Sequence, residues 1–141
     1  MTISPFAANQ SGTTIAGTEY RPGVCNIGPD EIARRRRAGH IGALAAVGLF
    51  VALVAIDAPA PLRLLVAIPA AGAASGYLQA HLKFCAGFGS RGVFNFGPVG
   101  PMETVADPED RARDRRRASQ IALASLAIGL AIGAGAAIVP L

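Results

Sequence analysis

Two cysteines and two histidines are the side chains of this 141-residue chain best suited to metal binding. Cys25 precedes the first long apolar stretch and Cys85 follows the second, while His40 and His81 lie near the same ends of these stretches. Two thiolates and two imidazoles would form a tetrahedral zinc or copper site. The sequence has no CxxC pair and no paired histidines, so this spacing matches no known zinc finger or ribbon. We therefore expect no cofactor, and packing at a membrane surface is the competing interpretation of these residues.

The same residues leave two further kinds of chemistry open. His40 or His81 could ligate haem or chlorophyll, as single helix histidines do, and the two cysteines could form a redox pair. The sequence contains no Walker A, HExxH or GxSxG pattern. This lack of a recognisable catalytic motif argues against both kinds of chemistry. We predict that the chain is not an enzyme.

The elements that would position these side chains follow from hydropathy. Hydrophobic residues make up 52% of the chain and charged residues only 16%, against about 25% charged in soluble domains. Three stretches, at about 38–56, 64–82 and 118–141, contain no Asp, Glu, Lys or Arg, and about 20 such residues suffice to cross a bilayer. The sequence predicts an all-α membrane protein with three transmembrane helices. The first two form a helical hairpin that turns at 57–61, and Pro69 kinks the second helix.

The distribution of basic residues predicts the orientation. Of 13 Lys and Arg residues, 12 lie before the first span or between the second and third, and only Arg63 lies in the turn between the first two spans. Because cytoplasmic loops carry the excess of basic residues, we expect a bacterial inner-membrane protein with a cytoplasmic amino terminus and an external carboxyl terminus. The Arg clusters are expected to contact anionic lipid headgroups rather than nucleic acid.

Four segments follow from this topology: a cytoplasmic arm (1–28), the first two helices (29–82), a cytoplasmic Gly/Phe-rich loop (83–107) and the third helix (108–141). The arm has no basic or apolar region in its first twenty residues, so we do not expect a cleavable signal peptide. Pro29 and Pro108 are each followed by two acidic residues. Proline at the first helical position and acids in the first turn are typical helix starts.

A seven-residue pattern, G-V-x-N-x-G-P, occurs before the first span and again in the loop before the third. Each copy is followed by acidic residues, an arginine run and an apolar span. We interpret this as an internal duplication, which predicts parallel pseudo-repeats of the first and third spans. Each copy is either a tight turn or a segment that docks on a surface. The matched residues are Gly23, Val24, Asn26, Gly28 and Pro29 in the first copy and Gly92, Val93, Asn95, Gly97 and Pro98 in the second.

Two GxxxG pairs, Gly72–Gly76 and Gly129–Gly133, predict faces where another helix backbone approaches closely, in this chain or another. With no charge in any span and no catalytic motif, the sequence favours a small accessory subunit of a larger respiratory, photosynthetic or other membrane complex. Its loops and glycine faces would contact the other subunits. The alternatives are a small carrier or metal-handling protein using Cys25, His40, His81 and Cys85, and a thiol-redox enzyme using the two cysteines.

Overall fold

The computed structural model describes residues 19–141, and residues 1–18 of the predicted cytoplasmic arm lie outside this range. The described chain is mostly helical. Three helical segments are long and apolar enough to cross a membrane: α1 (Pro29–Ala55), the segment Ala60–Leu82, and α5 (Pro108–Ile138). The prediction of three helices able to span a bilayer is confirmed.

The two long helices begin where their Pro-acid sequences predict. Pro29 is the first residue of α1 and Pro108 the first of α5. The Asp107 carboxylate accepts a hydrogen bond of 2.8 Å from the backbone N–H of Glu109, so it satisfies one of the free donors at the start of α5. Both helices continue unbroken from their arginine-rich first turns into the apolar stretches.

The middle segment is less regular. It consists of α2 (Ala60–Arg63), the 3₁₀ helix η2 (Leu64–Val66) and α3 (Ala67–Leu82). Pro69 has no N–H to bond the carbonyl of Leu65, four residues earlier. A 3₁₀ turn, η2, lies just before the turn of α3 that contains Pro69. The kink at Pro69 itself stays a prediction.

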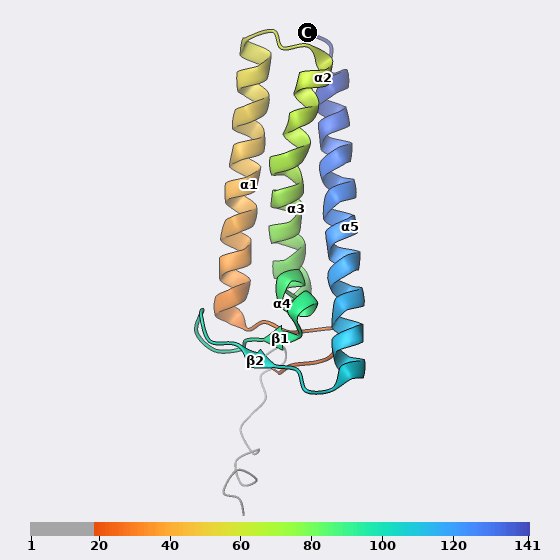
Figure 1. The fold of residues 1–141 in the computed structure, drawn as a ribbon. Helices are drawn as coiled ribbons and strands as arrows, with labels where there is room; N and C mark the ends of the chain where they lie inside the picture. Colours follow the sequence, from red (N-terminus) through yellow and green to blue (C-terminus); the bar gives the residue numbers. More distant parts are fainter. Residues whose placement is uncertain (1–18) are drawn as a thin grey trace, which may run out of the picture.

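The three long helices lie side by side, with α3 between α1 and α5 (Figure 1). α1 and α5 run in one direction and α3 in the other (Figure 1). Glycines bring the backbones together: a Cβ atom added at Gly42 of α1 would lie 2.6 Å from the backbone nitrogen of Ala73 in α3. Close approach of this kind is how helices associate in lipid, where no hydrophobic drive holds them together.

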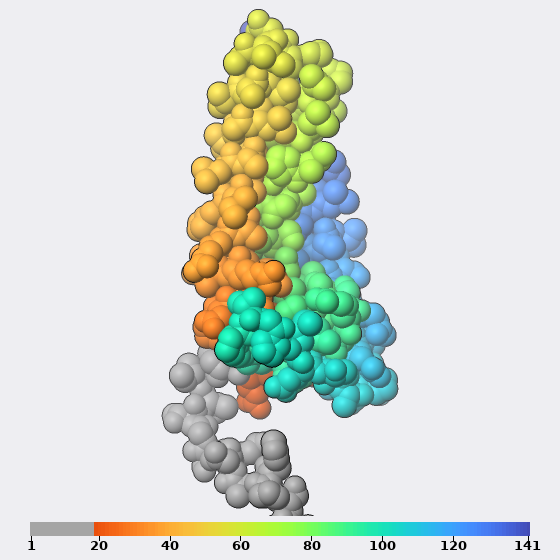
Figure 2. All heavy atoms as spheres, turned by 60° about the vertical axis from the view of Figure 1, so that its left-hand side comes forward, coloured from red at the N-terminus to blue at the C-terminus, as the bar shows by residue number. Residues whose placement is uncertain are grey.

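Residues 19–28 and 83–107 form a compact layer at one end of the helices, which we call the platform. It contains α4 (Ala86–Arg91) and an antiparallel pair of two-residue strands, β1 (Val93–Phe94) and β2 (Glu103–Thr104). Figure 2 shows the loop around residue 100 (teal) lying against the first turns of α1 (orange). The platform thus covers the start of α1, and α4 packs on α5.

The opposite end of the molecule is held by Arg63, the basic residue that the sequence placed in the turn between the first two spans. Its side chain is buried, and Nη1 donates to the backbone carbonyl oxygens of Ala136 (3.2 Å) and Val139 (2.8 Å). A cation bonded to the last carbonyls of a helix also opposes the negative end of its dipole. Arg63 therefore stabilises the carboxyl end of α5.

Candidate functional site

The two G-V-x-N-x-G-P segments pair with each other at the centre of the platform. The backbone N–H of Asn95 donates to the carbonyl of Asn26 (3.0 Å), and the N–H of Gly28 donates to the carbonyl of Asn95 (2.8 Å). Ile27 and Asn95 form a parallel β-bridge. Segments that are 69 residues apart in the sequence therefore form one hydrogen-bonded unit.

The two matched asparagines have different roles in this unit. The fully buried Asn26 side chain accepts a 2.7 Å bond from the N–H of Cys85 and donates a 3.1 Å bond to its carbonyl. The Asn95 side chain bonds only nearby residues, donating to the carbonyl of Pro98 and accepting from the N–H of Gly97. The first asparagine thus joins distant segments, while the second closes a local turn.

The glycines of the two segments account for their shape. Gly23 and Gly92 both have left-handed backbone conformations, with φ of +67° and +70°, which side chains other than glycine rarely adopt. A Cβ at Gly28 would lie 2.7 Å from the carbonyl oxygen of Phe96. The turn interpretation therefore describes the first glycine of each copy, and close contact between the copies explains Gly28.

Asp114 fixes the described part of the arm to α5. The carboxylate is fully buried, and its two oxygens each accept a 2.7 Å bond, one from the Tyr20 hydroxyl and one from the backbone N–H of Gly23. Burial and the neighbouring Asp114 raise the pKa of the Tyr20 phenol above its ordinary value of about 10. Tyr20 therefore stays a hydrogen-bond donor throughout the neutral range, and its ring stacks on Phe94 with centroids 4.6 Å apart.

The two cysteines occupy different polar surroundings inside the platform. Burial raises the pKa of the Cys25 thiol, which favours the protonated and less nucleophilic form. Cys85 lies beside Arg35 of α1, whose Nη2 is 2.8 Å from the sulfur. The same guanidinium nitrogen is 3.5 Å from the buried carboxylate of Glu31.

The predicted convergence of two cysteines and two histidines is wrong. Within residues 19–141, no three His, Cys, Asp or Glu side chains come close enough together to hold a metal ion. The His40 ring nitrogen Nδ1 lies 2.7 Å from the Tyr77 hydroxyl of α3, and His81 is exposed, whereas both cysteines are buried. Both histidines are exposed on their helices. The hydropathy pattern predicted the depth of each side chain in the membrane but not the direction in which it points, and this is why the predicted convergence was wrong.

The glycine faces also differ from the expectation that they contact other chains. A Cβ at Gly129 would lie 2.5 Å from the Cβ of Ala71, and one at Gly133 would lie 2.6 Å from the Cβ of Ala67. Gly76 is in similarly close contact with the backbone of Gly39 in α1. These three glycines pack helices within this chain, while a Cβ at Gly72 would meet no atom within 4 Å.

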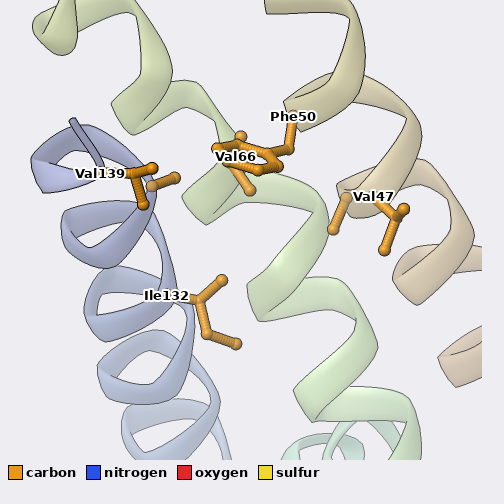
Figure 3. A pocket seen from close by; sticks show the side chains of 7 residues that line it. Val47, Phe50, Val66, Ile132 and Val139 are labelled. Atoms are coloured by element: carbon orange, nitrogen blue, oxygen red, sulfur yellow. The ribbon is translucent and has the colours of Figure 1, made fainter. Parts of the chain in front are cut away.

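An apolar groove between α1 and α5 remains open along the charge-free part of the helices. One hollow of about 260 Å³ and another of about 300 Å³ share Ala46, Val47 and Ile132 and form this α1–α5 groove. In Figure 3, Val47 and Phe50 come from α1, Val66 from η2 and Ile132 from α5, while Val139 follows the end of α5. The remaining lining residues are mostly small: Ala43, Ala70, Ala73, Ala74, Tyr77, Ile128 and Ala136.

Comparison with protein-family models, with curated proteins and with solved structures finds no match to this chain. The site is therefore defined by its own geometry. Sequence reasoning missed the roles of Asp114, Glu31 and Arg35. One signal was available. Asp114 is the single acidic residue inside the run R-A-R-D-R-R-R, and an isolated acid among arginines indicates a specific contact of its carboxylate.

Proposed function

We propose that this protein is a non-catalytic subunit of a larger bacterial membrane complex and receives a transmembrane helix of another subunit in its α1–α5 groove. The observation that carries the proposal is the groove itself. α1 and α5 both pack on α3 but hardly contact each other. The apolar α1–α5 groove therefore runs along the bundle, in the position where a fourth helix would pack.

The lining favours a helix as the occupant. Alanines form most of the groove floor, and small residues let helix backbones approach closely in lipid. Larger side chains stand at its edges, including Val47, Phe50 and Ile132, and these would fit between the side chains of an incoming helix. No charged residue lines the groove, which argues against an ion or proton path here.

The platform supports the same proposal. Its buried hydrogen bonds fix residues 20–28 and the start of α4 to the bundle, so it presents a shaped surface at one end of the helices. We propose that this end lies in the cytoplasm, because 12 of the 13 basic residues belong to it or to the adjoining first turns of α1 and α5. The carrier and metal-handling alternative has no comparable support, because its four residues are dispersed.

Photo-cross-linking in intact membranes tests the proposal. A photoreactive side chain at Val47, which lines the groove and is 62% exposed, should give one discrete adduct with a transmembrane segment of another protein. The same side chain at Ile132, across the groove, should capture the same segment. Ile41 is the control, because it is 68% exposed on the same helix and does not line the groove.

The proposal predicts a shared protein adduct from Val47 and Ile132 and only lipid adducts from Ile41. It would be overturned if all three positions reacted alike, or if the groove positions captured lipid alone. An adduct with a second copy of this chain would likewise replace the accessory-subunit proposal with a homo-oligomer.

A further inference from the structure

A second groove lies between the first turns of α1, the last turns of α3 and the start of α4, with a volume of about 370 Å³. It shares no lining residue with the α1–α5 groove. We call it the Arg35 groove, and its lining residues are Arg35, Ala38, Gly72, Ser75, Gly76, Gln79, Cys85 and Gly87.

The Arg35 groove changes from polar to apolar along its length. Arg35, Gln79 and Cys85 lie at the platform end, and Gly72 lies about two helical turns further from it. On α1, the arginine run ends at Arg37 and the charge-free stretch begins at Ala38. In a membrane, this groove would therefore cross the boundary between the headgroups and the hydrocarbon.

The polar end carries positive charge. The guanidinium groups of Arg35 and Arg91 each lie 5.6 Å from the ring centre of Phe88. Glu31 is the acidic partner of Arg35 and also lies 3.9 Å from Arg34, so two guanidinium groups share a single carboxylate. The contacts of Arg35 with Glu31 and Cys85 both use Nη2, whereas a guanidinium has five N–H donors. An anionic oxygen is the ligand that this arrangement suits best.

The apolar end contains space that helix packing leaves unfilled. Gly76 is pressed against the backbone of Gly39, but a Cβ at Gly72 would meet no atom within 4 Å. Within the described chain, Gly72 therefore has no packing partner that requires glycine. The bare helix surface leaves room for an extended hydrocarbon chain beside α3.

We propose that the Arg35 groove binds one anionic phospholipid from the leaflet on the platform side, with its phosphate at Arg35 and an acyl chain over Gly72. A phospholipid joins the two chemistries that the groove offers, a phosphate at the charged end and an alkyl chain at the glycine end. A free phosphate would use only the first. This inference goes beyond the accessory-subunit proposal and concerns a different surface.

Lipid retention measured by native mass spectrometry tests this inference on the purified full-length protein. The protein is released from nanodiscs that contain equal amounts of phosphatidylglycerol and phosphatidylcholine. Wild-type protein should retain one phosphatidylglycerol at least five times as often as one phosphatidylcholine. Gly72→Leu should reduce that retention at least fivefold, because the new side chain fills the open end of the groove. Ala38→Leu, on the exposed α1 side of the same groove, should do the same.

Gly48→Leu is the matched control, since a Cβ at Gly48 also meets no atom within 4 Å and Gly48 lies outside both grooves. It should retain phosphatidylglycerol like the wild type. Soluble glycerol phosphate, added as a competitor, should not displace the bound lipid. Equal retention of the two lipids, or unchanged retention in both groove-filling variants, would overturn the inference, and displacement by glycerol phosphate would assign the site to a free phosphate instead. None of these results affects the α1–α5 groove, so this inference and the proposed function fail separately.

Discussion

Gly129→Leu is expected to separate α5 from α3 and to lower the free energy of unfolding by about 3 kcal/mol, the upper part of the usual range for overpacking. Even the first carbon of the new side chain would lie 2.5 Å from the Cβ of Ala71 and 2.8 Å from the carbonyl oxygen of Ala67, where carbon atoms normally sit 3.5–4.0 Å apart (about the optimal contact distance). Both obstacles belong to the α3 backbone or its Cβ atoms, so no side-chain rotation relieves the clash.

The measurement is the apparent melting temperature in mild detergent, followed as the fraction of protein that remains monodisperse. We expect a decrease of roughly 10 °C for Gly129→Leu. Gly135→Leu is the matched control on the same helix, because a Cβ at Gly135 meets no atom within 4 Å. If both variants melted like the wild type, the close packing of α3 on α5 would be incorrect.

Asn26→Ala is expected to cost about 2–3 kcal/mol, because it leaves the buried N–H of Cys85 without its side-chain partner. It also removes one of two donors to the Cys85 carbonyl, which keeps the N–H of Gly89. Asn95→Ala should cost about 1 kcal/mol or less, since the groups it releases belong to the exposed Gly97 and Pro98, where water can replace the side chain. The comparison uses two matched positions of the G-V-x-N-x-G-P pattern.

The rate at which Cys85 reacts with iodoacetamide reports this difference, because the thiol is buried when the platform is intact. Asn26→Ala should speed the reaction markedly and Asn95→Ala only slightly. An equal effect of the two substitutions would mean that the asparagines have equivalent roles, contrary to their hydrogen bonds.

The long helices were predictable because their signals are local. Apolar runs without charge locate the three spans, and Pro-acid sequences at Pro29 and Pro108 locate the starts of α1 and α5. The missing N–H of Pro69 predicts an irregularity there, although the 3₁₀ turn η2 before it was not predicted.

The platform could not be predicted, because its contacts join residues far apart in the sequence. Asn26 and Cys85 are separated by 59 residues, and Tyr20 and Asp114 by 94. The repeated pattern suggested equivalent asparagines, whereas one bonds across the platform and the other within its own turn. The internal duplication of the first and third spans stays a hypothesis, supported by two similar glycine turns and by the parallel course of α1 and α5 (Figure 1).

The prediction of a metal site was wrong for a geometric reason. Placement near one end of the apolar stretches gives His40, His81, Cys25 and Cys85 a similar depth, but a shared depth does not bring side chains together. His40 is exposed on α1 beside Tyr77, and Cys85 is buried beside Arg35. The rotation of each helix about its axis decides the neighbours, and GxxxG spacing alone did not fix that rotation.

The cytoplasmic orientation of the platform is part of the proposed function, and reporter fusions test it most directly. A reporter that is active only outside the cytoplasm should be active when fused after Leu141, beyond the end of α5. The same reporter fused after the exposed Gly100, within the platform loop, should be silent. An active fusion at Gly100 together with a silent one at Leu141 would contradict the account, because it would place the platform and its arginines outside the cell.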